Sequence, residues 1–151
     1  MDLDRVTCSG LRQFAGTMLG MAEPDAQTAI ATYGMTALDT QNPRSLAVFY
    51  CALLGWEVTD VEDDWVTIRP PGGTAGGPAL AFQLAPDHVP PTWPDNSIPQ
   101  QFHLDLYVAD LDVGEQQVIA LGARLTGRPE EPGYFRVYLD PSGHPFCLCE
   151  G

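Results

Sequence analysis

The chain has 151 residues, of which 44% are hydrophobic and 18% charged, a composition typical of one globular domain with its own core. Its 20 acidic and 7 basic residues give a formal net charge of −13 at pH 7. This charge repels phosphate backbones and anionic lipids, so we expect neither nucleic acid nor a membrane as partner. A neutral or cationic small molecule suits such a field better.

The sequence also indicates the compartment. No apolar run is as long as the ~18 residues that a membrane-spanning helix needs. The acidic N-terminus, with Asp2 and Asp4, lacks the basic start of a secretory signal. The cysteines form neither a CxxC pair nor the spacing of a disulfide framework; they are Cys8, Cys51, Cys147 and Cys149. We therefore expect a reduced, cytoplasmic protein.

Residues 1–32 have a pattern of their own. Apolar residues recur at helical spacing between Leu11 and Leu19, and Ser9 before them is a suitable N-cap. A second short helix can begin near Pro24. These features predict an N-terminal helical extension, which would be either an arm packed on the domain or on a partner subunit, or a loosely held tail.

The rest of the chain repeats one order of elements. Residues 33–84 read as a strand, then a helix in "NPRSLAVFYCALLG" with Pro43 in its first turn and Gly55 as its stop, then three strands. Residues 85–101 form a proline-rich crossing. Residues 102–151 then repeat the order, from the strand "QFHLDLYV" through the helix "DLDVGEQQVIALG" to a last strand in "FCLCE".

An internal repeat of this kind predicts an α+β domain over residues 33–151, built from two βαβββ modules. Each module would carry one helix on one face of its sheet. Two such sheets set side by side would form an incomplete barrel, and the cleft between them would be the ligand site.

These segments, together with "DPSGHPFCLC" at the C-terminus, closely resemble the vicinal oxygen chelate superfamily. Within it, the chain is similar to the glyoxalase-like proteins related to bleomycin-resistance proteins. The resemblance covers about Tyr33 to Gly151 and implies the glyoxalase/bleomycin resistance fold. The superfamily includes metal-dependent isomerases, lyases, extradiol dioxygenases and epoxide-opening transferases, and also metal-free drug-binding proteins, so the fold alone does not determine the chemistry.

Enzymes of this superfamily hold one divalent metal with four inward-facing side chains, mostly His, Glu or Gln, from the first and last strand of each module. The resemblance places these roles on Met35, Gln83, His103 and Cys147. Met35 and Cys147 depart from the family pattern, because a thioether and a thiol replace the usual donors. Mg²⁺ is poorly served by this set, whereas Zn²⁺ accepts imidazole and thiolate. His103, Gln83 and Cys147 are the candidate metal ligands, although we expect no bound cofactor.

His103 shares a strand face with Asp105 and Tyr107. A histidine beside a carboxylate can act as a general base, or it can donate a hydrogen bond to a ligand. A nucleophile pair of Cys147 and His103 is a further alternative, but the sequence offers no evident orienting group or oxyanion donor for it. In the crossing, Trp93 is expected to cover the cleft.

Two other histidines receive structural interpretations. His144 is expected in a turn at the rim of the cleft. His88 is expected in solvent, with a lid contact as the alternative.

The sequence favours a protein that binds a small organic molecule, such as a cationic aromatic compound, without the usual metal site. The expected ligand-binding residues are Met35, Gln83, Trp93, His103, Asp105, Tyr107 and Cys147. One alternative is a lyase or isomerase of the same superfamily, either metal-dependent or with His103 as the catalytic residue. Another is a non-catalytic module that dimerises. A homodimer is expected, because members of this superfamily commonly pair their modules within or between chains.

Overall fold

The computed structural model describes residues 31–127 and 133–151, and residues 33–151 form one compact unit. The N-terminal helical extension predicted for residues 1–32 falls almost wholly outside the described residues. Within the described part of the chain, neither helix is long and apolar enough to cross a membrane.

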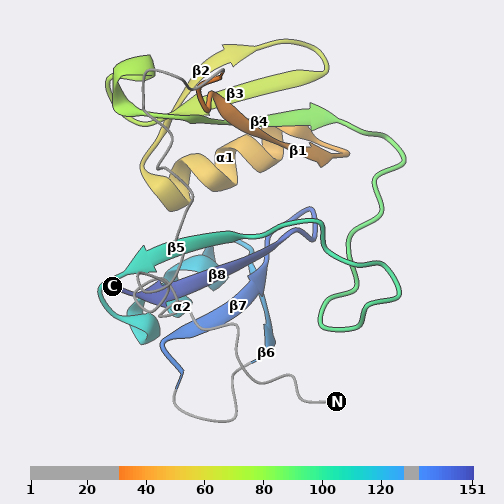
Figure 1. Ribbon diagram of the computed structural model, residues 1–151, viewed down its shortest axis with the longest axis vertical. Helices are drawn as coiled ribbons and strands as arrows, with labels where there is room; N and C mark the ends of the chain where they lie inside the picture. Colours follow the sequence, from red (N-terminus) through yellow and green to blue (C-terminus); the bar gives the residue numbers. More distant parts are fainter. Residues whose placement is uncertain (1–30, 128–132) are drawn as a thin grey trace, which may run out of the picture. The chain divides into compact units, whose positions relative to one another are not determined.

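The described residues form two modules with the predicted βαβββ order (Figure 1). The first consists of β1 (Met35–Thr40), α1 (Pro43–Leu54), β2 (Glu57–Val61), β3 (Trp65–Arg69), a short 3-10 turn η3 (Gly73–Gly76) and β4 (Ala79–Leu84). The second consists of β5 (Leu104–Val108), α2 (Leu111–Ala120), β6 (Arg124–Gly127), β7 (Phe135–Leu139) and β8 (Pro145–Glu150). Each module has a four-stranded sheet, in the order β1-β4-β3-β2 or β5-β8-β7-β6. The predicted α+β fold is confirmed.

Helix α1 begins and ends where the sequence predicts. The Asn42 side chain accepts the backbone N–H of Ser45 at 3.0 Å, and Pro43 occupies the first turn, where a missing N–H costs nothing. The helix ends at Gly55, whose φ of 66° is a left-handed conformation that glycine adopts without strain.

Helix α2 approaches its sheet closely at Gly114. A Cβ atom at this position would lie 3.2 Å from side-chain atoms of both Leu148 on β8 and Val108 on β5. The helix begins at Asp110, whose Oδ1 accepts the N–H groups of Asp112 and Val113 at 2.8 and 2.9 Å. A small residue in the first turn thus lets the helix lie directly on the two strands that carry the candidate site.

The two modules share one hydrophobic core, to which each contributes the helix-bearing face of its sheet. The Phe49 ring of α1 packs edge-on against Phe146 of β8 with centroids 6.1 Å apart, and Tyr50 stacks on Phe82 of β4 at 5.4 Å. Figure 1 shows α1 lying between the first sheet and the second module. Core side chains therefore fill the space between the modules of one chain. The two sheets are not closed into a barrel there.

A buried hydrogen bond joins α1 to the second module. The Tyr50 hydroxyl donates to Oδ2 of Asp140 at 2.9 Å, and both side chains are fully buried. The other carboxylate oxygen accepts the N–H groups of Ser142 and His144 at 2.8 and 3.0 Å. Burial raises the pKa of Asp140, while these hydrogen bonds and the charge of His144 act in the opposite direction. The carboxylate therefore organises the "DPSGH" turn and ties it to the first module.

A second set of polar contacts surrounds this turn. The hydroxyls of Thr40 and Ser142 lie 2.7 Å apart, and His144 Nε2 lies 2.6 Å from the Asp39 carbonyl oxygen. His88 Nε2 lies 3.2 Å from the Ser142 carbonyl, and its ring centroid is 4.7 Å from that of His144. His88 is thus half-buried in the seam between the modules and not in solvent as predicted, because the crossing folds back over the turn.

Replacing Tyr50 with Phe removes the donor to Asp140 and leaves a buried carboxylate oxygen unsatisfied. We expect the free energy of unfolding at pH 7 to fall by about 1–3 kcal/mol, measured by urea denaturation. Tyr134→Phe is the matched control, since its side chain is 72% exposed, and it should change stability little.

The loss in Tyr50→Phe should depend on pH. Because burial raises the folded-state pKa of Asp140, this carboxyl contributes stability at low pH that is lost as the pH rises through that pKa. The Tyr50 hydroxyl stabilises the ionised form and offsets part of that loss. The destabilisation should therefore be larger at pH 7 than below the folded-state pKa of Asp140, and a loss independent of pH would contradict this role.

Candidate functional site

The candidate site lies on the outer face of the second sheet, meaning the face that points away from α2 and the shared core. Strands β5 and β8 run parallel, with Asp105 paired to Cys147 and Tyr107 paired to Cys149. Side chains alternate along each strand, so Leu106 and its neighbours on β5 pack against the core while Asp105 and Tyr107 turn outward. The pairing therefore gathers two polar side chains of β5 and two cysteines of β8 on one surface.

Three of these groups form a compact cluster. His103 Nε2 lies 3.5 Å from Oδ1 of Asp105, and the ligand atoms of His103, Asp105 and Cys147 all lie within 4.8 Å of one another. The side chains of His103 and Asp105 are 32% and 42% exposed, whereas Cys147 is buried. An imidazole and a carboxylate are thus accessible to a ligand above a buried sulfur.

The cluster can support two kinds of chemistry. A histidine beside a carboxylate can accept or donate a proton. The three donors also fit a zinc ion, because imidazole, carboxylate and thiolate are all zinc ligands, and ligand atoms around one tetrahedral Zn²⁺ lie about 3.3–3.8 Å apart. Small rotations of the side chains would bring atoms within 4.8 Å to that spacing. The set is poorly matched to Mg²⁺, which prefers oxygen ligands.

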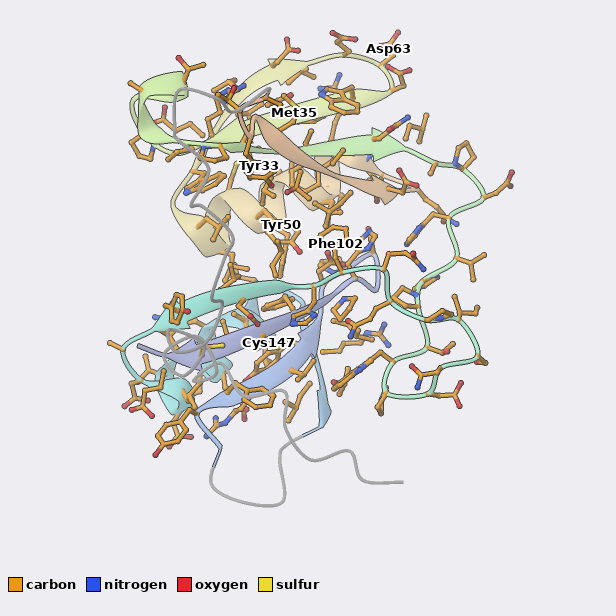
Figure 2. The ribbon with its side chains drawn as sticks, in the orientation of Figure 1. Tyr33, Met35, Tyr50, Asp63, Phe102 and Cys147 are labelled. Atoms are coloured by element: carbon orange, nitrogen blue, oxygen red, sulfur yellow. The ribbon has the colours of Figure 1, made fainter. Side chains whose placement is uncertain are left out.

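The two residues expected from the first module do not join this cluster. Met35 lies at the start of β1, opposite Ala79, and Gln83 lies near the other end of that sheet, paired with Asp39 and Trp65. Both belong to the outer face of the first sheet (Figure 2, which shows Met35 and Cys147 on different sheets). Within one chain, the four positions that the resemblance assigns to a metal therefore do not meet.

Within one chain, Asp105 and not Gln83 lies beside His103 and Cys147. The sequence predicts Asp105 as a ligand-binding residue and not as a metal ligand. A second sulfur also belongs to this surface, because Cys149 Sγ lies 4.0 Å from Oδ1 of Asp105. The alternation in "HLD" places Asp105 on the strand face of His103, and the alternation in "CLC" places Cys149 on the strand face of Cys147. The pairing of the two strands brings these faces together.

Two aromatic residues were expected beside the ligand. Tyr107 lies on the outer face of the second sheet and is 70% exposed, so its ring is available for stacking. Trp93 is half-buried in the crossing between β4 and β5, near a turn in which the Asp95 carboxylate accepts the Ser97 N–H at 2.8 Å. Its role as a cover over the ligand remains a prediction.

A separate small pocket of about 240 Å³ lies at the N-terminus of α1, beside the seam between the modules. It is lined by Thr40, Gln41, Asn42, Ser45, Leu46, His88, Pro141 and Ser142. None of the ligand-binding residues expected from the sequence is among them.

Two βαβββ modules with a polar cluster on one sheet define a paired-module α+β domain. A family model described as a glyoxalase-like domain matches residues 35–149, and the chain belongs to this family. The expected fold is therefore confirmed. No curated protein matches the chain.

Solved structures of the same fold come from several organisms. A glyoxalase/bleomycin resistance protein/dioxygenase family enzyme from Burkholderia phytofirmans PsJN has a TM-score of 0.62 and 17% identity, covering 80% of this chain and 98% of that one. The fosfomycin resistance protein FosX from Listeria monocytogenes has a TM-score of 0.60 and 16% identity, covering 82% and 95%. A bleomycin-binding protein complexed with bleomycin has a TM-score of 0.50 and 20% identity, covering 80% and 99%. At these identities the likeness concerns the fold.

Proposed function

We propose that this protein binds a small organic molecule against the outer face of its second sheet. The observation that carries the proposal is the half-exposed pair of His103 and Asp105, 3.5 Å apart, above Cys147. This pair offers a donor and an acceptor at the surface, and the exposed Tyr107 ring on the same face offers an apolar wall. A few polar groups next to an aromatic surface are typical of small-molecule sites.

The charge of the protein favours a neutral or cationic aromatic ligand. A formal net charge of −13 attracts cations, and the Asp105 carboxylate places one negative charge within the proposed site. Tyr107 can stack on an aromatic ring or bind a cation by its π face. Among solved structures of this fold, one protein binds bleomycin, which supports a ligand of this size and kind.

We propose that binding proceeds without the four-ligand metal site of the family's enzymes. Met35 offers only a thioether, Cys147 replaces a carboxylate, and Gln83 lies on the other sheet. A reducing, cytoplasmic environment would keep the cysteines of β8 as thiols.

We further propose that the working form is a homodimer with composite sites. Each chain turns the outer faces of both sheets away from its own core, so Gln83 and His103 of one chain do not face each other. If the first sheet of one chain covered the second sheet of its partner, two equivalent sites would form, each with Gln83 from one chain and His103 from the other. This arrangement would form a cleft between the two outer faces.

A second candidate function is that of a lyase or isomerase in which His103 moves a proton. The observation that favours it is the 3.5 Å separation between His103 Nε2 and the Asp105 carboxylate, which places an acceptor beside the imidazole. Turnover of a bound ligand that His103→Ala abolishes while binding persists would establish the enzyme. If the protein dimerises and binds no ligand, it would be an interaction module instead.

The ligand proposal can be tested by thermal shift and fluorescence titration with bleomycin and other cationic aromatic compounds. A ligand that binds the folded state and not the unfolded state raises the melting temperature by an amount that grows with the ratio of its concentration to its dissociation constant. We expect His103→Ala and Asp105→Asn each to weaken binding by at least about tenfold, the loss of a hydrogen bond to a charged group.

The matched control is Asp63→Asn, which removes the same charge from the exposed turn between β2 and β3 (Figure 2). It should leave the dissociation constant nearly unchanged. Equal weakening by Asp63→Asn and Asp105→Asn would mean that the net charge, and not the site, attracts the ligand.

The composite site predicts a specific pattern of complementation. In a mixed dimer of His103→Ala and Gln83→Ala chains, one cleft would carry both changes and the other would be intact, so half of the ligand binding should return. A mixed dimer of His103→Ala and Asp105→Asn chains should recover none, because both changes affect the second sheet. Light scattering measures the oligomeric state, and a monomer that binds ligand normally would exclude the composite site.

A further inference from the structure

The outer face of the second sheet also points to a metal site unlike the family's usual one. We propose that His103, Asp105, Cys147 and Cys149 bind a thiophilic divalent cation such as Zn²⁺ on one sheet of a single chain. The usual set draws on both modules, whereas this set uses only β8, β5 and the residue just before β5.

The geometry comes from the parallel pairing of β5 with β8. Oδ1 of Asp105 lies 3.5 Å from His103 Nε2 and 4.0 Å from Cys149 Sγ, so this carboxylate lies between an imidazole and a sulfur. Cys147 Sγ lies within 4.8 Å of the ligand atoms of both His103 and Asp105. His103, Asp105 and Cys147 thus form the compact set, and Cys149 Sγ adds a fourth donor on the Asp105 side of it.

The donor chemistry selects the ion. Two thiolates, one imidazole and one carboxylate are a set that Zn²⁺ accepts, with bonds of about 2.0–2.3 Å. Soft sulfur ligands disfavour Mg²⁺ and Ca²⁺, which need several oxygen atoms. Each thiol would release its proton to solvent as the sulfur–metal bond forms, so affinity should rise with pH.

The backbone supports such a site. Strand β8 lies between β5 and β7, so the cysteines sit on a strand paired along both edges. Their positions are therefore fixed before an ion arrives, which reduces the entropy lost on binding. His103 and Asp105 are partly exposed, so they leave a route for the ion and room for an outer ligand.

This inference does not rest on the proposed organic ligand. Ion binding can be measured on the protein alone, and an ion on this cluster would either compete with an organic ligand for His103 or hold it as an outer ligand. Failure of either proposal therefore leaves the other open to its own test.

The test is a titration of the reduced, untagged, full-length protein with Co²⁺, followed by displacement with Zn²⁺. Cobalt bound to thiolate absorbs in the near ultraviolet, and tetrahedral cobalt absorbs strongly in the visible region. We expect one Co²⁺ per chain with a sulfur band, displaced by one Zn²⁺. Cys147→Ser, Cys149→Ser, Asp105→Asn and His103→Ala should each weaken Zn²⁺ affinity by at least about tenfold.

Two matched variants complete the design. Gln83→Ala tests the family's usual set, while Cys51→Ser removes a sulfur atom from α1, and both should bind Zn²⁺ as the parent does. Circular dichroism confirms that every variant is folded.

Cobalt binding without a sulfur band would overturn the proposal, as would the absence of any binding. A loss in Gln83→Ala as large as that in Cys149→Ser would also overturn it and would indicate the usual site built from both modules.

Discussion

The arrangement of this domain depends on the buried hydrogen bond between Tyr50 and Asp140. A carboxylate removed from water is costly unless every lone pair is satisfied, and here one helix of the first module and one turn of the second share that task. The bond fixes where α1 lies against the second sheet, and the rings of Phe49 and Phe146 then pack around it. Because the helix-bearing faces meet in this way, both outer faces point away from the shared core.

The candidate site follows from strand pairing more than from any single residue. Parallel pairing of β5 with β8 places His103 and Asp105 on the same face of the sheet as Cys147 and Cys149. No residue of the first module is needed to assemble the cluster. The outer face of the first sheet carries Ala37 and Ala81 together with the larger Met35, Gln83 and Trp65.

Much of the fold could be predicted from the sequence, because its signals are local. Asn42 and Pro43 mark the start of α1, Gly55 marks its end, and the repeated order of elements predicts both modules. The packing of the modules against each other could not be predicted. The alternation of residues shows which face of a strand is apolar, but it does not show which other element packs on that face. For that reason the sequence alone does not show that Asp105, and not Gln83 of the same chain, lies beside His103 and Cys147.

The shared core has a consequence for how the repeat behaves as a folding unit. Each module has its own sheet and helix. One side of α1 packs on the sheet of its own module, and a second side contacts Phe146 and Asp140 of the other module. A chain cut within the crossing would expose that second side to water. We therefore expect the two modules to fold and unfold together in a single cooperative step, although the sequence repeats the same order of elements twice.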